Sequence, residues 1–289
     1  MGGSLRFEAP TALQYFAALV AEDASFSLLE AAVAVAHAEY PQIDPQAVLQ
    51  QMDLLADRLR RRLPADAGSL QKLRLLNQYF FQELGFAGNV NNYYDPRNSY
   101  LPSVLETRRG IPITLALLYV ELATQVGLTA SGVSFPGHFL VKVHMPRGEV
   151  VIDPFNGQSL SREDLDERLA PYRRERGLEG DFEMPLGLFL QPAPPRDVLA
   201  RLLRNLKEIH RAGEDWPRLI AVLDRLVILL PQAWEERRDR GLAHAELGEP
   251  AAAVADLAAY LAHRPAADDA AALRQRLAEL GGAGAPRWH

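Results

Sequence analysis

Residues 130–154 read ASGVSFPGHFLVKVHMPRGEVVIDP, and this stretch decides the fold. Pro-Gly and Pro-Arg-Gly turns divide it into three short apolar runs. In the middle run apolar side chains recur at every second position, which is the period of a β-strand. Short runs of this kind joined by tight turns are typical of antiparallel strands. We therefore expect strands at residues 130–135, 139–145 and 149–152.

Two residues with catalytic chemistry stand at the ends of these strands. His138 opens the second strand, and Asp153 closes the third. In an antiparallel hairpin the first residue of one strand lies near the last residue of its partner, so the two side chains can approach each other. A carboxylate beside an imidazole fixes its tautomer and raises its basicity, which is how a nucleophile is activated. The alternative is a polar contact that only stabilises the hairpin.

The residues before this stretch predict helices. Apolar side chains recur three and four positions apart in four segments before residue 86, and again just before the strands. Asp44-Pro45 is a typical helix start, and Gly127 is a typical helix stop. The helices are expected at residues 11–21, 27–40, 45–63, 69–84 and 112–126. Helices followed by an antiparallel meander indicate an α+β core.

A polar and aromatic loop separates these helices. Residues 88–101 read GNVNNYYDPRNSYL, with four asparagines and three tyrosines, and the aromatic density favours an ordered loop. With Arg109 it provides candidates for lining a cleft for a peptide or an amide-bearing ligand. In the alternative reading the same polar groups only satisfy backbone hydrogen bonds. The candidates are Asn91, Asn92, Tyr93, Tyr94, Asp95, Arg97, Asn98 and Arg109.

The carboxyl-terminal part of the chain repeats itself. Pro231 and Pro265 are 34 residues apart, and small residues recur around them where helices would touch. This is the period of a tetratricopeptide repeat, and it predicts two repeats followed by a capping helix at residues 267–280. Trp216 and Trp234 are expected to anchor the repeat core. A proline-rich passage that ends at Pro195 reads as a linker between domains at residues 1–190 and 196–282.

Composition excludes several classes of function. The chain has 289 residues and no cysteine, so disulfides, thiolate catalysis and cysteine-ligated metals are impossible. The net charge is −6 and the acidic residues are scattered, which disfavours nucleic-acid binding. The sequence has no signal-peptide pattern and no apolar run of membrane-spanning length, so we expect a cytoplasmic protein without a membrane partner. A metal site with His138 and His144 is excluded because they would lie almost 20 Å apart along a strand, and we expect no cofactor.

Three segments together resemble the transglutaminase-like superfamily, a relative of the papain fold. They are GIPITLALLYVELATQVGL, similar to the helix that carries the nucleophile, and PGHFLVKV and VVIDPF, similar to the strands that carry histidine and aspartate. With NNYYDPRNSYL they resemble a bacterial family of transglutaminase-like proteins with tetratricopeptide tails, named after an invasion regulator. The likeness covers roughly residues 30–275. It implies that His138 is the general base and Asp153 its orienting partner.

The nucleophile of that superfamily has no counterpart in this chain. The resemblance puts the cysteine position at Pro112 or Ile113, and neither residue can attack a substrate. The nearest hydroxyl is that of Thr114, which would have to lie within about 3 Å of His138 to be activated. The alternative is that Thr114 caps its own helix or faces the preceding loop.

Three functional hypotheses follow. In the favoured one, the protein is a non-catalytic binding or adaptor protein that uses its old cleft and its repeats to hold a protein or peptide. The second is a hydrolase of amide or peptide bonds, with His138 as base and Thr114 or a water as nucleophile. The third gives His138 and Asp153 a purely structural role.

Overall fold

The computed structural model describes residues 10–23, 26–178 and 184–283, with side chains up to residue 281. The first nine residues, which carry most of the segment examined for a signal peptide, lie outside the described residues. Contacts divide the chain into two compact units. We call residues 27–36 and 43–202 the front unit, and residues 1–26, 37–42 and 203–289 the repeat unit. This division places the boundary inside a helix. The predicted domain limits at 190 and 196 stay a prediction.

The front unit begins with helices close to the predicted positions. Asp44 caps the helix that starts at Pro45 by accepting a hydrogen bond from the backbone N–H of Gln46. The short helix α5 was not predicted. Helix α7 begins at the capping box of Ser161 and continues to Arg176, beyond residues 161–169, whose charged pattern predicts a helix. The helices are α2 (Leu28–Val35), α3 (Pro45–Arg60), α4 (Ser69–Asn77), the π-helical η3 (Gln78–Glu83), α5 (Leu101–Thr107), α6 (Pro112–Gln125), α7 (Arg162–Arg176) and α8 (Leu186–Phe189).

A four-stranded antiparallel sheet follows α6. Its order is β3-β4-β5-β6, formed by β3 (Ala130–Val133), β4 (Leu140–Met145), β5 (Gly148–Asp153) and β6 (Gln158–Leu160). The first three strands were predicted, and β6 was not, since its three residues carry no alternating pattern. The prediction that His138 opens a strand is wrong, because His138 lies in a bend two residues before β4.

Two short strands, β1 and β2, hold the asparagine-rich loop near the end of β5. Ala87–Gly88 (β1) pairs in parallel with Arg109–Gly110 (β2), and so joins the two ends of the asparagine-rich segment. A Cβ atom at Gly88 would lie 2.2 Å from the ring of Phe155, so only glycine fits there. The backbone N–H of Gly88 donates to the carbonyl of Phe155 at 2.7 Å. The loop is thereby held against Phe155, two residues after the end of β5.

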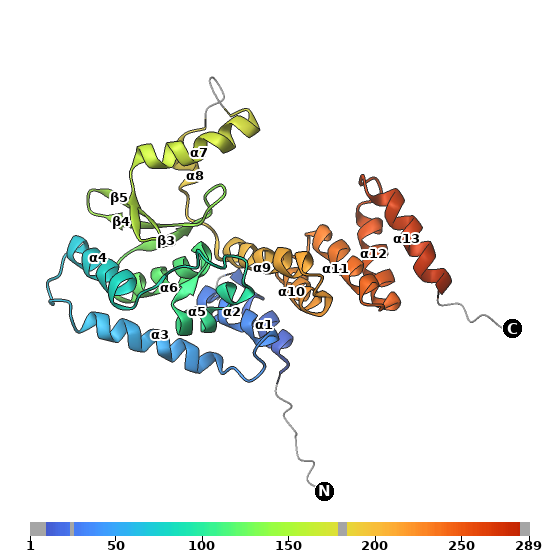
Figure 1. The fold of residues 1–289 in the computed structure, drawn as a ribbon, viewed down its shortest axis with the longest axis horizontal. Coiled ribbons are helices and arrows are strands. Elements are labelled where there is room, and N and C mark those ends of the chain that lie inside the picture. Colours follow the sequence, from blue (N-terminus) through green and yellow to red (C-terminus); the bar gives the residue numbers. More distant parts are fainter. Residues whose placement is uncertain (1–9, 24–25, 179–183, 284–289) are drawn as a thin grey trace, which may run out of the picture. The chain divides into compact units, whose positions relative to one another are not determined.

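The core of the front unit has a helix on each side of the sheet. Helix α6 is apolar around most of its circumference and is buried from Pro112 to Tyr119, which is typical of a central helix. On the other side, Leu165 and Leu169 of α7 pack against Val133 and Leu140. Figure 1 shows the strands lying between α6 and α7. This sandwich holds the ends of β4 and β5 firmly, and those ends carry the candidate site.

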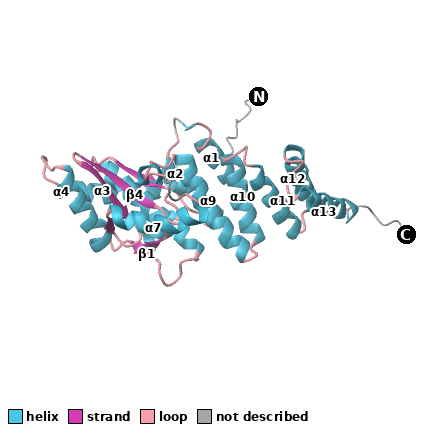
Figure 2. Ribbon diagram, turned by 90° about the horizontal axis from the view of Figure 1, so that it is seen from above, coloured by secondary structure: helices cyan, strands magenta, loops and turns pink. Residues whose placement is uncertain are grey.

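The repeat unit is helical throughout its described part (Figure 2). Helices α10 and α12 begin at residues 216 and 250 and end at residues 229 and 263, so both ends are offset by 34 residues, as the repeat predicts. Trp234 stacks on His263 with ring centroids 3.6 Å apart. The helices are α1 (Ala12–Leu19), α9 (Pro195–Ala212, of which residues 195–202 belong to the front unit), α10 (Trp216–Leu229), α11 (Trp234–Glu246), α12 (Pro250–His263) and α13 (Ala270–Ala283).

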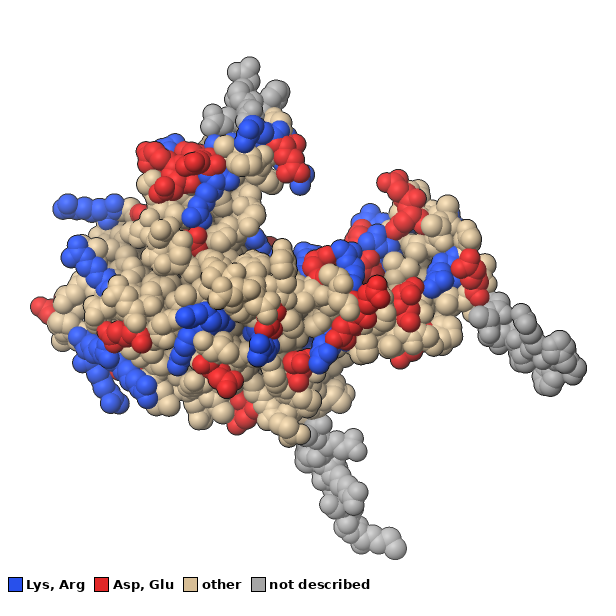
Figure 3. Space-filling model, in the orientation of Figure 1, with Lys and Arg blue, Asp and Glu red and all other residues tan. Residues whose placement is uncertain are grey.

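Charged side chains also hold the repeat helices together. Lys207 is buried and contacts both Glu236 and Asp239, while Arg240 joins Asp224 to Asp256. Figure 3 shows acidic and basic side chains interspersed over α11, α12 and α13. The mixed signs agree with the scattered charges of the sequence. No helix in the described ranges is long and apolar enough to cross a membrane.

We expect Gly241→Val to destabilise the repeat unit by about 1–3 kcal/mol, because a Cβ at this position of α11 would lie 2.9 Å from the buried Leu257 of α12. The matched control is Gly281→Val in α13, where a Cβ atom would meet nothing within 4 Å. That change should stay within about 1 kcal/mol. Urea unfolding followed by circular dichroism measures both, and equal losses would contradict the close contact between α11 and α12.

Candidate functional site

His138 and Asp153 meet as the sequence predicts. The Nε2 atom of His138 lies 2.8 Å from Oδ1 of Asp153. Asp153 is the last residue of β5 and is 3% exposed, whereas the side chain of His138 is 25% exposed. A buried carboxylate therefore holds an imidazole that solvent or a ligand can reach.

The carboxylate has two further donors that the sequence analysis missed. Oδ1 also accepts the backbone N–H of Phe155 at 3.0 Å, and Oδ2 accepts Nη1 of Arg168 at 2.8 Å. Burial alone would raise the pKa of Asp153, but the hydrogen bonds from His138, Arg168 and Phe155 outweigh it and hold the pKa below its usual value. Arg168 lies on α7, in the charged segment that follows the strands. Only the packing of α7 on the sheet brings it to Asp153.

A second arginine holds the backbone around His138. Arg201, near the start of α9, donates through Nη1 to the hydroxyl of Ser134 at 2.7 Å and to the carbonyl of Phe135 at 3.3 Å. Its Nη2 donates to the carbonyl of His138 at 2.8 Å. These bonds fix the bend that presents the imidazole. The sequence carries no signal for this contact, because Arg201 lies more than sixty residues further along the chain.

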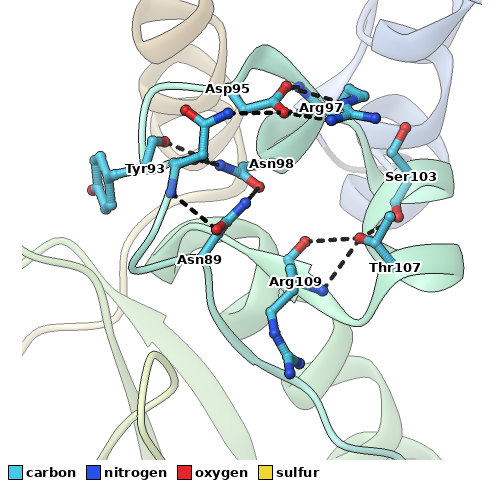
Figure 4. Close-up of polar contacts among 9 residues, drawn as sticks. Asn89, Tyr93, Asp95, Arg97, Asn98, Ser103, Thr107 and Arg109 are labelled. Atoms are coloured by element: carbon cyan, nitrogen blue, oxygen red, sulfur yellow. Dashed lines mark hydrogen bonds and ion pairs between the residues drawn. The ribbon is translucent and has the colours of Figure 1, made fainter.

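The asparagines of the loop hold one another (Figure 4). The buried amide of Asn98 donates to the carbonyls of Asn92 and Tyr93, and its oxygen accepts from the amide of Asn89. Oδ1 of Asn89 accepts the backbone N–H of Asn92. Asn98 thus organises the loop from inside, which matches the reading in which these polar groups satisfy the backbone.

Asp95 and Arg97 contact each other at the loop surface. The carboxylate of Asp95 caps the short 3-10 helix η4 (Pro96–Ser99) and accepts Nη2 of Arg97 at 2.8 Å. Arg109 donates to the carbonyls of Gly85 and Arg108, and its guanidinium points away from Asp95 and Arg97 in Figure 4. These contacts stabilise the loop and do not involve His138.

Two of the three loop tyrosines, Tyr93 and Tyr94, are exposed, whereas Tyr100 is buried. Tyr93 is 43% exposed, and its ring centroid lies 6.1 Å from that of Phe155, the residue whose N–H contacts Asp153. Burial and the neighbouring Tyr94 raise the pKa of Tyr93, while the positive charge of Arg201 opposes this rise. Tyr94 and Asn91 are exposed beside it. Tyr93 is therefore linked to the His138–Asp153 pair through Phe155.

The hydroxyl of Thr114 is fully buried and already bonded. It lies 2.8 Å from the carbonyl of Asn98 and 3.0 Å from that of Ile111, and it accepts the backbone N–H of Ile111 at 3.2 Å. Thr114 thus caps its own helix and faces the preceding loop, as one of the two sequence-based alternatives states. Pro112 and Ile113, at the expected cysteine position, are also buried.

His144, the second histidine of this hairpin, contacts Glu149 and not the His138–Asp153 pair. His144 lies 3.3 Å from Glu149 and is exposed. Within the described residues no group of three or more histidine and acidic side chains has the arrangement of a metal site.

Comparison with known proteins identifies the family. The model of the transglutaminase-like superfamily matches residues 46–204, and the tetratricopeptide-repeat model matches residues 206–278. The UPF0162 protein of Xylella fastidiosa strain Temecula1 is 38% identical over 260 residues, which cover 90% of this chain and 92% of the relative. The chain belongs to the UPF0162 family of transglutaminase-like proteins.

More distant relatives match over most of their length. The UPF0162 protein of Pseudomonas aeruginosa is 30% identical over 88% of this chain and 91% of its own length. UPF0162 protein YchA of Escherichia coli K12 is 27% identical over 78% of this chain and 81% of its own. No solved structure matches the chain. This UPF0162 protein has no cysteine, so the thiol chemistry of transglutaminases is impossible for it.

We expect Asp153→Asn to change the acid sensitivity of this protein. A carboxyl group with a lowered pKa stabilises the fold above its unfolded pKa of about 3.9, and this contribution is lost as the pH falls through the lower folded pKa. The variant should lose about 1–3 kcal/mol of unfolding free energy at pH 7. Below about pH 4 its unfolding free energy should fall less steeply with decreasing pH than that of the wild type. Asp66→Asn, at an exposed turn, is the control. Parallel acid profiles for wild type and Asp153→Asn would refute this role.

Thr114→Val should remove the capping hydroxyl while keeping the shape of the side chain. Because the buried N–H of Ile111 and the carbonyl of Asn98 lose a partner, we expect a loss of about 1–3 kcal/mol in unfolding free energy. Thr124→Val, in the same helix, removes an exposed hydroxyl that donates to the carbonyl of Val120 and should cost less than about 0.5 kcal/mol. Thermal and urea unfolding compare the two, and equal stability of both variants would exclude the capping role.

Proposed function

We propose that this protein is a non-catalytic binding or adaptor protein that holds a peptide or protein segment at its former transglutaminase-like cleft and a protein partner on its repeats. The observation that carries the proposal is the burial and hydrogen bonding of the Thr114 hydroxyl. Its hydroxyl is fully buried and bonded within its own helix start, and the chain has no thiol. The position from which the superfamily attacks its substrate therefore offers no exposed nucleophile.

The surroundings of His138 support recognition. The imidazole is partly exposed, its backbone is held by Arg201, and its ring is oriented by Asp153. Tyr93 adds an aromatic face with a hydroxyl group near Phe155. Rigid aromatic and hydrogen-bonding groups of this kind suit the backbone amides and side chains of a peptide, since little conformational entropy is lost on binding.

The repeats support a second binding surface. Tetratricopeptide repeats stack helix pairs into extended surfaces that bind other chains. In the repeat unit the helices are joined by buried ion pairs, such as that of Lys207 with Glu236, and so form a stiff support. The proposed setting is the cytoplasm, as the sequence analysis expects.

The alternative function is a hydrolase of amide or peptide bonds. It draws support from the His138–Asp153 contact at 2.8 Å, which is the geometry of a general base with its orienting partner. With Thr114 occupied, the nucleophile of this alternative would be a water molecule. Binding without cleavage and cleavage itself can be separated in one experiment.

We expect the full-length protein to retain a subset of a random peptide library in intact form. After incubation, protein-bound and free peptides are separated by size and analysed by mass spectrometry. His138→Gln should weaken retention about tenfold, which corresponds to about 1.4 kcal/mol. His144→Gln, on the exposed side of the same hairpin, should retain peptides like the wild type.

Two results contradict the proposal. Cleavage products that accumulate with wild type and disappear with His138→Gln would establish the hydrolase. Absence of retained peptides with the wild type would exclude peptide binding at the cleft. Point variants are needed, because a truncation at Pro195 would also remove Val198, Leu199 and Arg201 from the front unit.

A further inference from the structure

The charge balance around His138 points to the ligand. Asp153 is the buried carboxylate of the site, and both of its oxygens are occupied. Oδ2 pairs with Arg168, and Oδ1 accepts His138 and the N–H of Phe155. The positive charge of Arg168 is thus balanced by Asp153, and Asp153 has no free oxygen facing a second cation.

Arg201 is the second cation, and it has no such balance. All of its hydrogen bonds go to neutral oxygens, namely the hydroxyl of Ser134 and the carbonyls of Phe135 and His138. Within the described part of the chain it forms no ion pair, not even with Asp197, which lies one turn earlier in α9. The guanidinium carbon also lies 5.5 Å from the ring centroid of Phe139. The neutral oxygens orient Arg201 but leave its charge uncompensated.

Removing part of the water around the guanidinium of Arg201 costs free energy, and no ion pair of Arg201 offsets that cost in the described part of the chain. Burial lowers the pKa of Arg201, which reflects the loss of water around the guanidinium. Arg201 is half-buried, so water still screens part of its charge, but the part of the guanidinium that is removed from water has no anionic partner among the described residues. A ligand that brings an anionic group to Arg201 supplies the counter-charge that its neutral partners do not provide.

The neighbouring groups are suited to such an anion. The phenol of Tyr93 is near enough to Arg201 for each to influence the other electrostatically, and Tyr93 is 43% exposed. The imidazole of His138, whose carbonyl Arg201 holds, is 25% exposed. Arg201 therefore lies next to the backbone of His138 and within electrostatic reach of Tyr93, and a guanidinium is the group that pairs most strongly with a carboxylate.

We infer that the cleft binds its peptide through a carboxylate, with Arg201 as the cationic anchor and Tyr93 and His138 beside it. This inference rests on the proposed peptide-binding function and adds the chemical class of the group recognised. The carboxylate can come from the carboxyl terminus of the peptide or from an acidic side chain. A guanidinium held by three hydrogen bonds suits either source, because it is fixed in orientation before the ligand arrives.

The test uses the peptides retained by the full-length protein in matched forms, with free or amidated carboxyl termini and with Glu or Gln at each acidic position. Affinities are measured by fluorescence anisotropy at low and high salt. We expect wild type to prefer one carboxylate form over its neutral counterpart by about tenfold, less at high salt. A terminal carboxylate and an acidic side chain are told apart by which neutralisation causes the loss.

Variants of Arg201 distinguish its role in carboxylate recognition from its role in holding the bend at residues 134–138. Arg201→Gln should bring the ratio of carboxylate to neutral affinity to about one, whereas Arg201→Lys should keep part of the preference because the charge remains. Arg147→Gln, at the exposed turn between β4 and β5, should keep the full ratio. Loss of stability alone would lower both affinities and leave their ratio unchanged.

The outcomes are distinct. If wild type binds carboxylate and neutral peptides equally, the inference is wrong while peptide binding stands. If Arg201→Gln keeps the wild-type ratio, Arg201 is not the anchor and the inference is also wrong. If no peptide binds in any form, the proposed function fails and the inference with it.

Discussion

The carboxylate of Asp153 is the interaction on which the site depends. It ends β5, receives the imidazole of His138 from the bend before β4, and receives Arg168 from α7. Three segments are therefore held at one buried anion. Because a buried carboxylate needs several donors to remain ionised, removing any of them affects the others. The sandwich of α6, sheet and α7 supplies the apolar surroundings that make these bonds strong.

Much of the architecture was predictable because it depends on local patterns. Alternating apolar residues mark β4 and β5, the 34-residue period marks α10 and α12, and Asp44 marks the start of α3. The family models confirm the transglutaminase-like and tetratricopeptide parts. The contact of His138 with Asp153 also follows locally, since one hairpin joins the two residues. The predicted start of a strand at His138 was wrong. The turn at Pro136-Gly137 extends through His138, further than the apolar pattern suggested.

The second set of contacts was beyond sequence reasoning. Arg168 and Arg201 stand in charged helices, and nothing in their surroundings distinguishes them from solvent-exposed arginines. Their roles arise when α7 packs on the sheet and when α9 meets the bend at residues 134–138. The same holds for Asn98. Its sequence context permits cleft lining as well as loop support, and only its burial and its bonds to Asn92 and Tyr93 distinguish the two. Long-range packing, unlike periodicity, leaves no signature in a single sequence.

The start of α6 has no thiol nucleophile, whereas the polar contacts of His138, Asp153 and Arg168 are present. A thiol at the start of α6 would need an exposed position, whereas Pro112, Ile113 and Thr114 are all buried, and the threonine hydroxyl closes the helix start against Asn98. The start of α6 is thus buried, and its hydroxyl group is taken up by hydrogen bonds within the fold. The packing of α6 on the sheet involves apolar side chains, whereas His138, Asp153 and Arg168 join the bend, β5 and α7 through polar contacts. The polar network joins the bend before β4, the end of β5 and α7 at Asp153, and it leaves a partly exposed imidazole at its edge, so a contribution to stability and a group that a ligand can reach occur at the same position.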